Sequence, residues 1–463
     1  MKALLMPLAL ASLATAGYLV APSAPNDAID PTTGLPDPKV PGFQFPEADL
    51  TVNQWVYGGA FAEQVRHGWG LWTALTQESG KTIGGEPLRV FETWVSPKEL
   101  IAASADGGQL MQDAPVRTAG FARPNQLQAP LPDAAGPDFG LVVDVSYNPA
   151  AARHAVSNSL FKRSTLESYL DMGYERIPDF PAESITLKPV WKIIRKSELN
   201  EQGLYVLPAW PGPPPSPQAF GQSEWNAVVY VDPNGPANGN GAIDRGMRGP
   251  TAATTYDLDD FIHFSLTDAD AQHLEQRGID PAPESGDISI LVAMHVTTRE
   301  IERWTWQTFW WEASPDQPAE PSNAQLAGLR PAQLQGAPRH YAMGLGYQML
   351  EPAQPVFGGR SVGTPMPVYN PYLEAGFGPS TFQWSEPVET PTGRDTMAYG
   401  VESNCMTCHA AAQYDPQVDY TDGNNRQTPY AANYYVDLGA PAFEGSLQVD
   451  FLWSILGELE LSK

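Results

Sequence analysis

Cysteine is rare and positive charge is in short supply in this 463-residue chain. Its two cysteines cannot form the framework of a disulfide-rich scaffold. Lys and Arg number 27 against 53 Asp and Glu, so the net charge is −26, and no basic run occurs. This balance argues against nucleic acids and anionic membrane surfaces as partners. Beyond the N-terminus no stretch approaches the roughly 18 apolar residues of a membrane span, so none is expected.

Charged residues as a whole are also few, at 17% of the chain, whereas Pro (46) and Gly (41) are abundant. This mixture predicts many short strands joined by long loops. No internal repeat with a fixed period is present. We therefore expect one large α+β domain that is predominantly antiparallel β, with a sandwich-like core, peripheral helices and long loops.

The N-terminus has the features of a secretory signal peptide over residues 1–16. Lys2 precedes an apolar run from Ala3 to Leu13, and the following Ala-Thr-Ala has the small-x-small pattern that signal peptidase cleaves. The run is too short for a stable membrane anchor, which disfavours the alternative of an uncleaved N-terminal anchor. The expected location is therefore periplasmic or secreted.

Hydrophobic periodicity predicts the main elements of the domain. Mixed three- and four-residue spacings predict a helix over 54–80 and a weaker one over 164–172. Alternating or continuous apolar runs predict strands over 88–97, 139–147, 183–194, 224–233, 260–266, 287–298 and 303–311.

Composition also divides the chain into four parts. After the signal peptide, residues 17–50 form a Pro-rich lead that we expect to be extended and to lie on the surface. Residues 51–400 form the β-rich body. Residues 401–463 contain both cysteines and are expected to pack on that body, because they are few for an independent domain.

The strongest local signal is the stretch ESNCMTCHAAA over 402–412. In a c-type cytochrome, two thiols add across the two vinyl groups of a haem, and an imidazole binds its iron from one face. Cys-x-x-Cys-His supplies all three groups on one turn. Cys405 and Cys408 would carry one covalent haem c, and His409 would be the proximal iron ligand. Such attachment occurs outside the cytoplasm, in agreement with the signal peptide.

Three other interpretations of the cysteine pair are weaker. A thioredoxin-like redox pair would follow a strand and open the helix of a βαβ unit, which the pattern does not contain. A zinc site would need further ligands, and the six other histidines form no second cluster. A plain disulfide is the default for two exported cysteines, but it does not account for their spacing or for the adjacent histidine.

The second axial ligand of the iron is not apparent from the sequence. Residues 410–463 contain no Met and no His, so a protein ligand would have to come from upstream. The upstream candidates are Met397, Met366, Met343, Met349, His340, His295 and His67. An open or water-filled sixth position is an equal alternative.

Two further patterns have simpler interpretations that we prefer. Trp304, Trp306, Trp310, Trp311 and Trp453 could stack on a haem or pass electrons, but we expect them to fill the core. Asp232, Asn234, Asn240 and Asp244 could supply oxygen ligands to calcium, but they lack the EF-hand spacing, so a solvated Asn/Gly turn is favoured.

Several segments, taken in order, resemble a group of uncharacterised exported single-haem proteins of the cytochrome c family. They are WTALTQES, RVFETWVSP, ITLKPVWKII, ILVAMHVTT, WTWQTFWW, SNCMTCHAAA and DFLWSI, scattered between about residues 72 and 455. The resemblance implies a haem motif near the C-terminus of a larger body, with attachment at Cys405 and Cys408 and iron ligation by His409. Where that pattern would have Glu-His, this chain has Trp310-Trp311, so no polar role is carried over to that position.

These observations lead to three functional hypotheses. The first is a periplasmic single-haem protein that transfers single electrons to a redox partner protein, which would suit the acidic surface if that partner is basic. The second is a haem-dependent oxidoreductase of the peroxidase or oxygenase type with an open distal site. The third is a haem-based ligand-binding module.

Overall fold

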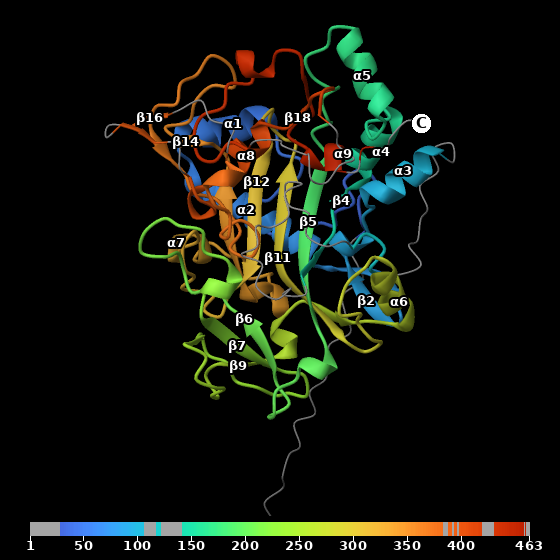
Figure 1. Cartoon of the computed structure of the whole chain (residues 1–463), viewed down its shortest axis with the longest axis vertical. Helices are drawn as coiled ribbons and strands as arrows, with labels where there is room; N and C mark the ends of the chain where they lie inside the picture. The colour runs from blue at the N-terminus through green and yellow to red at the C-terminus, as the bar shows by residue number, and fades with distance from the viewer. Residues whose placement is uncertain are drawn as a thin grey trace, which may run out of the picture.

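A seven-stranded antiparallel sheet forms the centre of the molecule (Figure 1). The computed structural model describes residues 28–105, 117–121, 141–382, 388–390, 393–395, 398–418, 430–457 and 459. Along the sheet the order is β13 (Tyr341–Gly346), β12 (Thr305–Trp311), β11 (Ile288–Thr298), β5 (Ile185–Ile194) and β3 (Leu141–Val143). Two short strands complete it, β10 (His263–Ser265) on β11 and β4 (Ser146–Tyr147) on β5.

The two longest strands, β5 and β11, are covered on both faces. Their sequences, ITLKPVWKII and ISILVAMHVTT, are rich in the β-branched and aromatic residues that favour strands. Every residue of β5 is buried except Lys188, and every residue of β11 except His295. These two residues are paired across the strands, so they mark the one place where this part of the sheet meets open space.

Two helices cover one face of the sheet and are drawn in blue behind it in Figure 1: α1 (Asp49–Gly58) and α2 (Phe61–Leu75). Trp72 of α2 stacks on Phe309 of β12, with ring centroids 4.2 Å apart. The single helix predicted over 54–80 is therefore wrong in its extent. Gly59 adopts a left-handed conformation (φ 67°) that ends α1, and β1 (Glu78–Ile83) follows α2.

The strand predicted over 88–97 is also wrong for most of its length. β2 (Glu86–Arg89) gives way to a 3-10 turn at Val90–Thr93, and α3 (Pro97–Ala105) follows. The Glu92 carboxylate accepts the backbone N–H of Arg89 (2.9 Å) and the side chain of Arg117 (2.7 Å), which favours the turn over a continued strand. Similarly, the strand predicted over 139–147 is interrupted at Asp144 between β3 and β4.

The other predicted elements are confirmed. The strands expected over 183–194, 287–298 and 303–311 are β5, β11 and β12, and the one expected over 260–266 is β10. The strand over 224–233 is β7 (Ala227–Asp232), and the weaker helix is α5 (Arg163–Asp171). β7 belongs to a four-stranded sheet with β6 (Tyr205–Pro208), β8 (Asp244–Arg245) and β9 (Thr255–Asp257), at the lower end of the central sheet in Figure 1.

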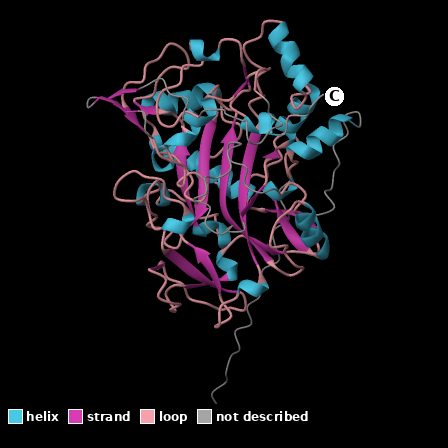
Figure 2. Cartoon of the chain, in the orientation of Figure 1, coloured by secondary structure: helices cyan, strands magenta, loops and turns pink. Residues whose placement is uncertain are grey.

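The remaining elements are short and peripheral. They are α4 (Pro149–Ser157), α6 (Asp268–Gln276), α7 (Ala324–Ala327), β14 (Leu350–Glu351), β15 (Thr364–Pro365), β16 (Val388–Thr390), β17 (Gly393–Asp395), α8 (Cys405–Ala410), β18 (Gln413–Tyr414), β19 (Leu447–Gln448) and α9 (Trp453–Gly457). Figure 2 shows strands in the middle of the molecule, helices around them, and long loops between them. The fold is thus α+β with mainly antiparallel sheets, as expected, and inner residues of both larger sheets share one hydrophobic core.

A second hydrophobic cluster joins the C-terminal segment to the body. Trp304 and Trp306, at the end of the β11–β12 hairpin, pack with Met406 of α8 and with Phe451 and Ile455 near the C-terminus. The lead is also anchored, since Leu35 is buried in the main core. Residues 1–27, with the expected signal peptide, lie outside the described residues.

In the part of the chain that the structure describes, no helix has the length and apolar character needed to cross a membrane.

Candidate functional site

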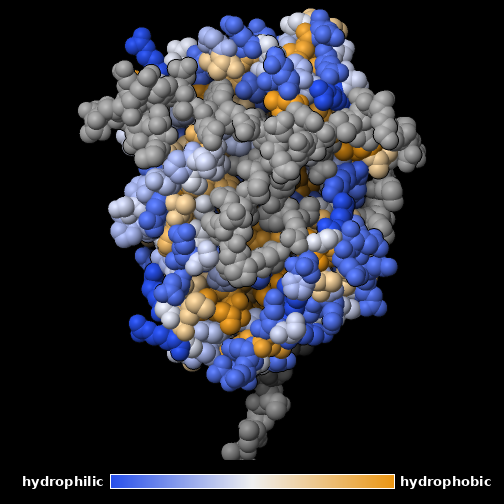
Figure 3. Space-filling model, in the orientation of Figure 1, coloured by the Kyte–Doolittle hydropathy of each residue, from blue (hydrophilic) through white to orange (hydrophobic). Residues whose placement is uncertain are grey.

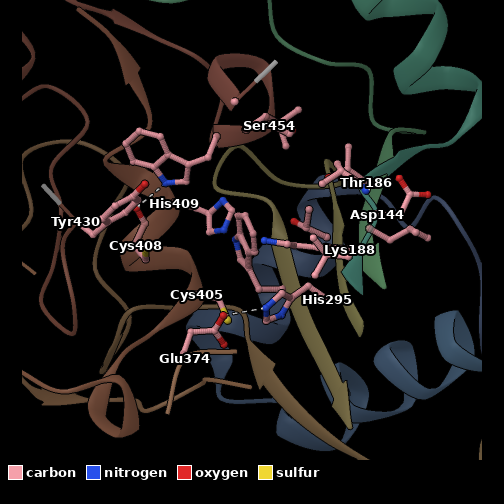
Figure 4. A pocket seen from close by; sticks show the side chains of 18 of the residues that line it. Asp144, Thr186, Lys188, His295, Glu374, Cys405, Cys408, His409, Tyr430 and Ser454 are labelled. Carbon is pink, nitrogen blue, oxygen red and sulfur yellow. Dashed lines mark hydrogen bonds and ion pairs between the residues drawn. The ribbon is translucent and has the colours of Figure 1, made fainter. Parts of the chain in front are cut away.

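A cavity of about 230 Å³ lies between the central sheet and α8, and the residues of the Cys-x-x-Cys-His motif line it (Figure 4). A single water needs roughly 10–15 Å³ measured in this way, so the cavity has room for a much larger group. A second hollow near Asp450 measures only about 10 Å³. The cavity is therefore the natural place to look for a bound molecule.

The chain around α8 is fixed mainly by Asn404, which is fully buried. Its side-chain oxygen accepts the backbone N–H of Thr407 (3.0 Å), which caps the helix. Its amide nitrogen donates to the backbone carbonyls of Gln348 (3.2 Å) and Met366 (2.8 Å). The start of α8 is thereby tied to the body of the protein, and both cysteines are held at the cavity wall.

Cys405 and Cys408 are both free thiols and are both partly open to the cavity. Burial raises the pKa of each thiol, and the nearby Glu374 carboxylate raises it further. Both side chains are therefore protonated thiols at neutral pH. A nucleophilic redox cysteine needs the opposite shift, so the environment disfavours that alternative.

His409 has one ring nitrogen bonded to the protein and one left for the cavity. Its Nδ1 lies 2.7 Å from the backbone oxygen of Phe451, so Nδ1 carries the proton and donates it to that carbonyl. Nε2 then has an unshared electron pair and no hydrogen-bond partner among the described residues. Burial lowers the pKa of His409 to about 4, so the imidazole is neutral at pH 7. A neutral imidazole with a bonded Nδ1–H is the form that binds a metal.

Aromatic rings surround the motif. The indole of Trp306 lies with its centroid 4.2 Å from that of His409. Trp453 donates from Nε1 to the backbone carbonyl of Cys408 (3.3 Å) and packs against Tyr430. With Phe377 and Phe382 these rings give the cavity the apolar walls that a flat organic group requires.

The opposite wall carries polar side chains from the two strands β5 and β11. His295 Nε2 lies 3.1 Å from Glu374 Oε1, and Lys188 extends from the sheet toward His409 (Figure 4). Burial lowers the pKa of Lys188 to about 8, although Glu374 opposes that shift. Burial alone would raise the pKa of Glu374. The interaction with His295 and the hydrogen bond from the Asn370 backbone N–H outweigh the effect of burial and lower this pKa, so the carboxyl is ionised at neutral pH.

Asp144 lies at another part of the wall, where β3 and β4 are interrupted. Its carboxylate accepts hydrogen bonds from the backbone N–H of Val145 (2.7 Å) and the hydroxyl of Ser146 (3.0 Å). Burial raises the pKa of Asp144 to about 7. Gly120 passes so close that a Cβ there would lie 2.0 Å from an Asp144 oxygen, so a larger residue at this position would require the Asp144 side chain to shift.

Among the candidate distal ligands that the structure describes, only His295 lines the cavity. His340 contacts Asp260 instead (3.3 Å), and His67 is bonded to Tyr347 and Glu300. The sulfurs of the three described methionines among the candidates also lie elsewhere: Met366 contacts Gln348, Met349 accepts the Val436 N–H, and Met343 lies beside Gly68 of α2. Met397 lies outside the described residues.

The two aspartates considered as calcium ligands have other partners. Asp232 accepts the N–H of Asn234 in a turn (2.8 Å), and Asp244 accepts Tyr230 (2.8 Å) and the N–H of Gly249 (2.9 Å). Within the described ranges, no group of three or more His, Cys, Asp or Glu side chains is arranged to hold a metal ion. A haem iron, which a porphyrin holds on four sides, does not require such a group.

The tryptophans divide into two sets. Trp310 and Trp311 fill the main core, as expected, and Trp304 fills the second cluster. Trp306 and Trp453, in contrast, line the cavity.

Several site residues could not be found from the sequence. Lys188, Glu374 and Asp144 join the motif only through the fold. The Phe451 carbonyl is a backbone group and leaves no trace in the sequence. The one available signal was the presence of Lys188 and His295 in strand sequences that are mostly apolar.

The residues present fit a covalently attached haem. Two free thiols and an imidazole with an available Nε2 face one cavity with aromatic walls. Comparison with known proteins gives no information about this site, because no family model, no curated protein and no solved structure matches the chain.

Proposed function

We propose that this protein is an exported c-type haem protein that transfers single electrons. One haem would be attached through Cys405 and Cys408, with His409 as the proximal ligand. The observation that carries the proposal is the position of the whole motif on one cavity, with Nδ1 of His409 bonded and Nε2 available. A bound haem iron would supply the redox chemistry by alternating between its ferric and ferrous states.

The chain's own residues would orient the imidazole, exclude bulk water and screen the charge of the site. The Phe451 carbonyl and the Trp306 ring set the orientation of His409. Trp453, Phe377 and Phe382 provide the apolar surroundings, and Lys188 and His295 would hold carboxylate groups of a bound haem. The resemblance to exported single-haem proteins and the N-terminal signal sequence support the same proposal.

A haem stain of the denatured protein tests the attachment. The full chain is produced with its signal sequence in a host that matures c-type cytochromes, alongside the double variant Cys405→Ser/Cys408→Ser. Covalent haem should stain in the parent protein and be absent from the variant. A blank parent band in a host that matures a control cytochrome would contradict the proposal.

A second candidate function, a haem-dependent oxidoreductase, is favoured by one observation. The only described distal candidate on the cavity, His295, is already bonded to Glu374 through Nε2, which leaves an open sixth position as a real alternative. Carbon monoxide added to the dithionite-reduced protein distinguishes the two functions. An unchanged Soret band supports a six-coordinate electron carrier, whereas a prompt shift supports an open iron and the enzymatic function.

A further inference from the structure

The backbone carbonyl that holds His409 belongs to a segment with an uncommon conformation. Asp450 has φ 46° and Phe451 has φ 68°, both in the left-handed region. Residues other than glycine adopt this region rarely, and it is unfavourable for a bulky residue such as Phe. Such a conformation persists only where surrounding contacts impose it.

A third left-handed residue lies in direct contact with this segment. Trp304, with φ 58°, closes the loop between β11 and β12, near α8 and α9 at the upper end of the sheet in Figure 1. In the described part of the chain only seven non-glycine residues have positive φ, and three of them belong to this one contact. Their concentration beside the motif points to a common cause.

The Asp450 carboxylate is the group that links them. Oδ1 accepts the indole N–H of Trp304 (3.1 Å). Oδ2 accepts Nε–H of Arg299 (3.1 Å) and the backbone N–H of Phe180 (3.0 Å). The side chain is only 6% exposed. Three donors from two separate parts of the body thus converge on one buried carboxylate.

This arrangement fixes the next residue as well. Because both carboxylate oxygens of Asp450 are hydrogen-bonded, its backbone dihedral angles are restricted. The peptide group between Asp450 and Phe451 therefore keeps its direction. The Phe451 carbonyl is then directed at His409 Nδ1, 2.7 Å away. The Phe451 ring packs in the second hydrophobic cluster, within 6.3 Å of the Trp306 centroid.

We propose that Asp450 is a positioning residue for the imidazole of His409, which it orients through the Phe451 carbonyl. The orientation itself is a property of the protein with or without haem. Its consequence for the iron rests on the proposed function: a bonded Nδ1–H makes Nε2 more basic, which favours ferric iron and lowers the reduction potential.

The competing explanation is that Asp450 contributes only stability by joining the β11–β12 hairpin to the C-terminal segment. A matched control separates the two. Asp287 is another buried carboxylate (3% exposed) that accepts backbone N–H groups, from Lys196 (2.9 Å) and Glu284 (2.8 Å), and it does not line the cavity. Asp287→Asn should lower stability without altering His409.

The first measurement is NMR spectroscopy of the full chain without haem. The double variant Cys405→Ser/Cys408→Ser, which cannot attach haem, is labelled with ¹⁵N-histidine. We expect a slowly exchanging Nδ1–H signal for His409. Adding Asp450→Ala should abolish this signal, while adding Asp287→Asn should leave it in place. If Asp450→Ala does not fold, Trp304→Phe removes one of the three donors, keeps a ring at that position, and should increase the exchange rate of the same signal.

The second measurement uses the haem-loaded protein. Asp450→Ala should raise the reduction potential, with an increase of about tenfold in the ferrous-to-ferric ratio at fixed ambient potential, equivalent to about 59 mV for one electron. Unchanged exchange and unchanged potential in a folded Asp450 variant would overturn the proposal. Because the first measurement needs no haem, a protein that fails to bind haem would refute the proposed function and still leave the role of Asp450 decided.

Discussion

At the scale of single residues, His409 and the aromatic rings around it matter most for the proposed haem site. The Trp306 indole covers the imidazole, is 4% exposed, and donates its own N–H to the Arg303 carbonyl (3.0 Å). It therefore contributes both to the packing of the second cluster and to the orientation of His409.

Replacing Trp306 should separate these contributions. Trp306→Ala should lower the free energy of unfolding in urea by about 3–5 kcal/mol, as for other buried tryptophans, and should also alter the visible spectrum of the haem-loaded protein. Trp72→Ala, which removes an equally buried ring from the main core, should have a similar cost in stability and leave that spectrum unchanged. Equal spectra for both variants would contradict the assigned role of Trp306.

Asp144 gives a prediction about pH. Its pKa of about 7 in the folded protein exceeds the ordinary value of 3.8, so the folded state holds a proton that the unfolded state releases. The stabilisation is complete below about pH 4 and is lost as pH rises through 7. Relative to the parent protein, Asp144→Asn should therefore gain about 3 kcal/mol of unfolding free energy between pH 4 and pH 8.

Urea unfolding of both proteins across this pH range provides the check. Asp244→Asn serves as the control. Burial acts to raise the pKa of Asp244, but hydrogen bonds from Gly249, Arg248 and Tyr230 lower it overall. Its stabilisation is thus lost only at lower pH, and the relative stability of Asp244→Asn should stay flat from pH 5 to 8. A flat difference for Asp144→Asn as well would show that burial does not affect the Asp144 carboxyl as described.

At the scale of elements, α8 is a six-residue helix that is too short to be stable alone. Its position depends on Asn404, which combines a helix cap with two hydrogen bonds to the body. Asn323 caps α7 in the same way, through Gln325 (2.9 Å) and Leu326 (3.0 Å), but it is exposed. The two asparagines therefore form a natural comparison.

Asn323→Ala should cost about 1 kcal/mol of unfolding free energy, the usual value of a helix cap. Asn404→Ala should cost about 2–4 kcal/mol, because it also leaves two carbonyls without a donor. Denaturant unfolding measures both values, and the haem content of each purified variant should fall only for Asn404→Ala. Equal costs would mean that Asn404 acts only as a cap.

The long central strands and the motif were predictable from the sequence for a local reason. The mostly apolar runs of β5 and β11 and the spacing of Cys405, Cys408 and His409 are properties of adjacent residues. A single helix over 54–80 was predicted wrongly because Gly59 ends a helix only when it adopts the left-handed conformation. The sequence alone does not reveal that conformation. Glu374 and the Phe451 carbonyl escaped prediction because only the tertiary fold brings them to the motif.

The cavity is formed by parts of the chain that are far apart in the sequence, since its walls come from β5, β11, the loop after β15 and the C-terminal segment. The motif-bearing segment also shares the second hydrophobic cluster with Trp304 and Trp306 of the body. Figure 3 shows hydrophilic residues over much of the described surface on this face, with apolar patches between them. The body and the C-terminal segment should therefore lose their structure together.

This expectation can be tested by unfolding the haem-loaded protein in guanidinium. The Soret absorbance reports the C-terminal segment, and far-UV circular dichroism reports the sheets. The two signals should change with one midpoint, because the segment has no core separate from the body. A Soret transition that is complete before the sheets unfold would indicate an independent haem segment.

The central claim is that one haem is attached at this motif, and peptide mass spectrometry tests it most directly. The protein is matured in a host competent for c-type cytochromes, digested, and the peptide that contains residues 405–409 is sequenced by fragmentation. We expect a single haem joined to both Cys405 and Cys408 of that peptide and to no other. Two unmodified thiols, or a disulfide between Cys405 and Cys408, would contradict it.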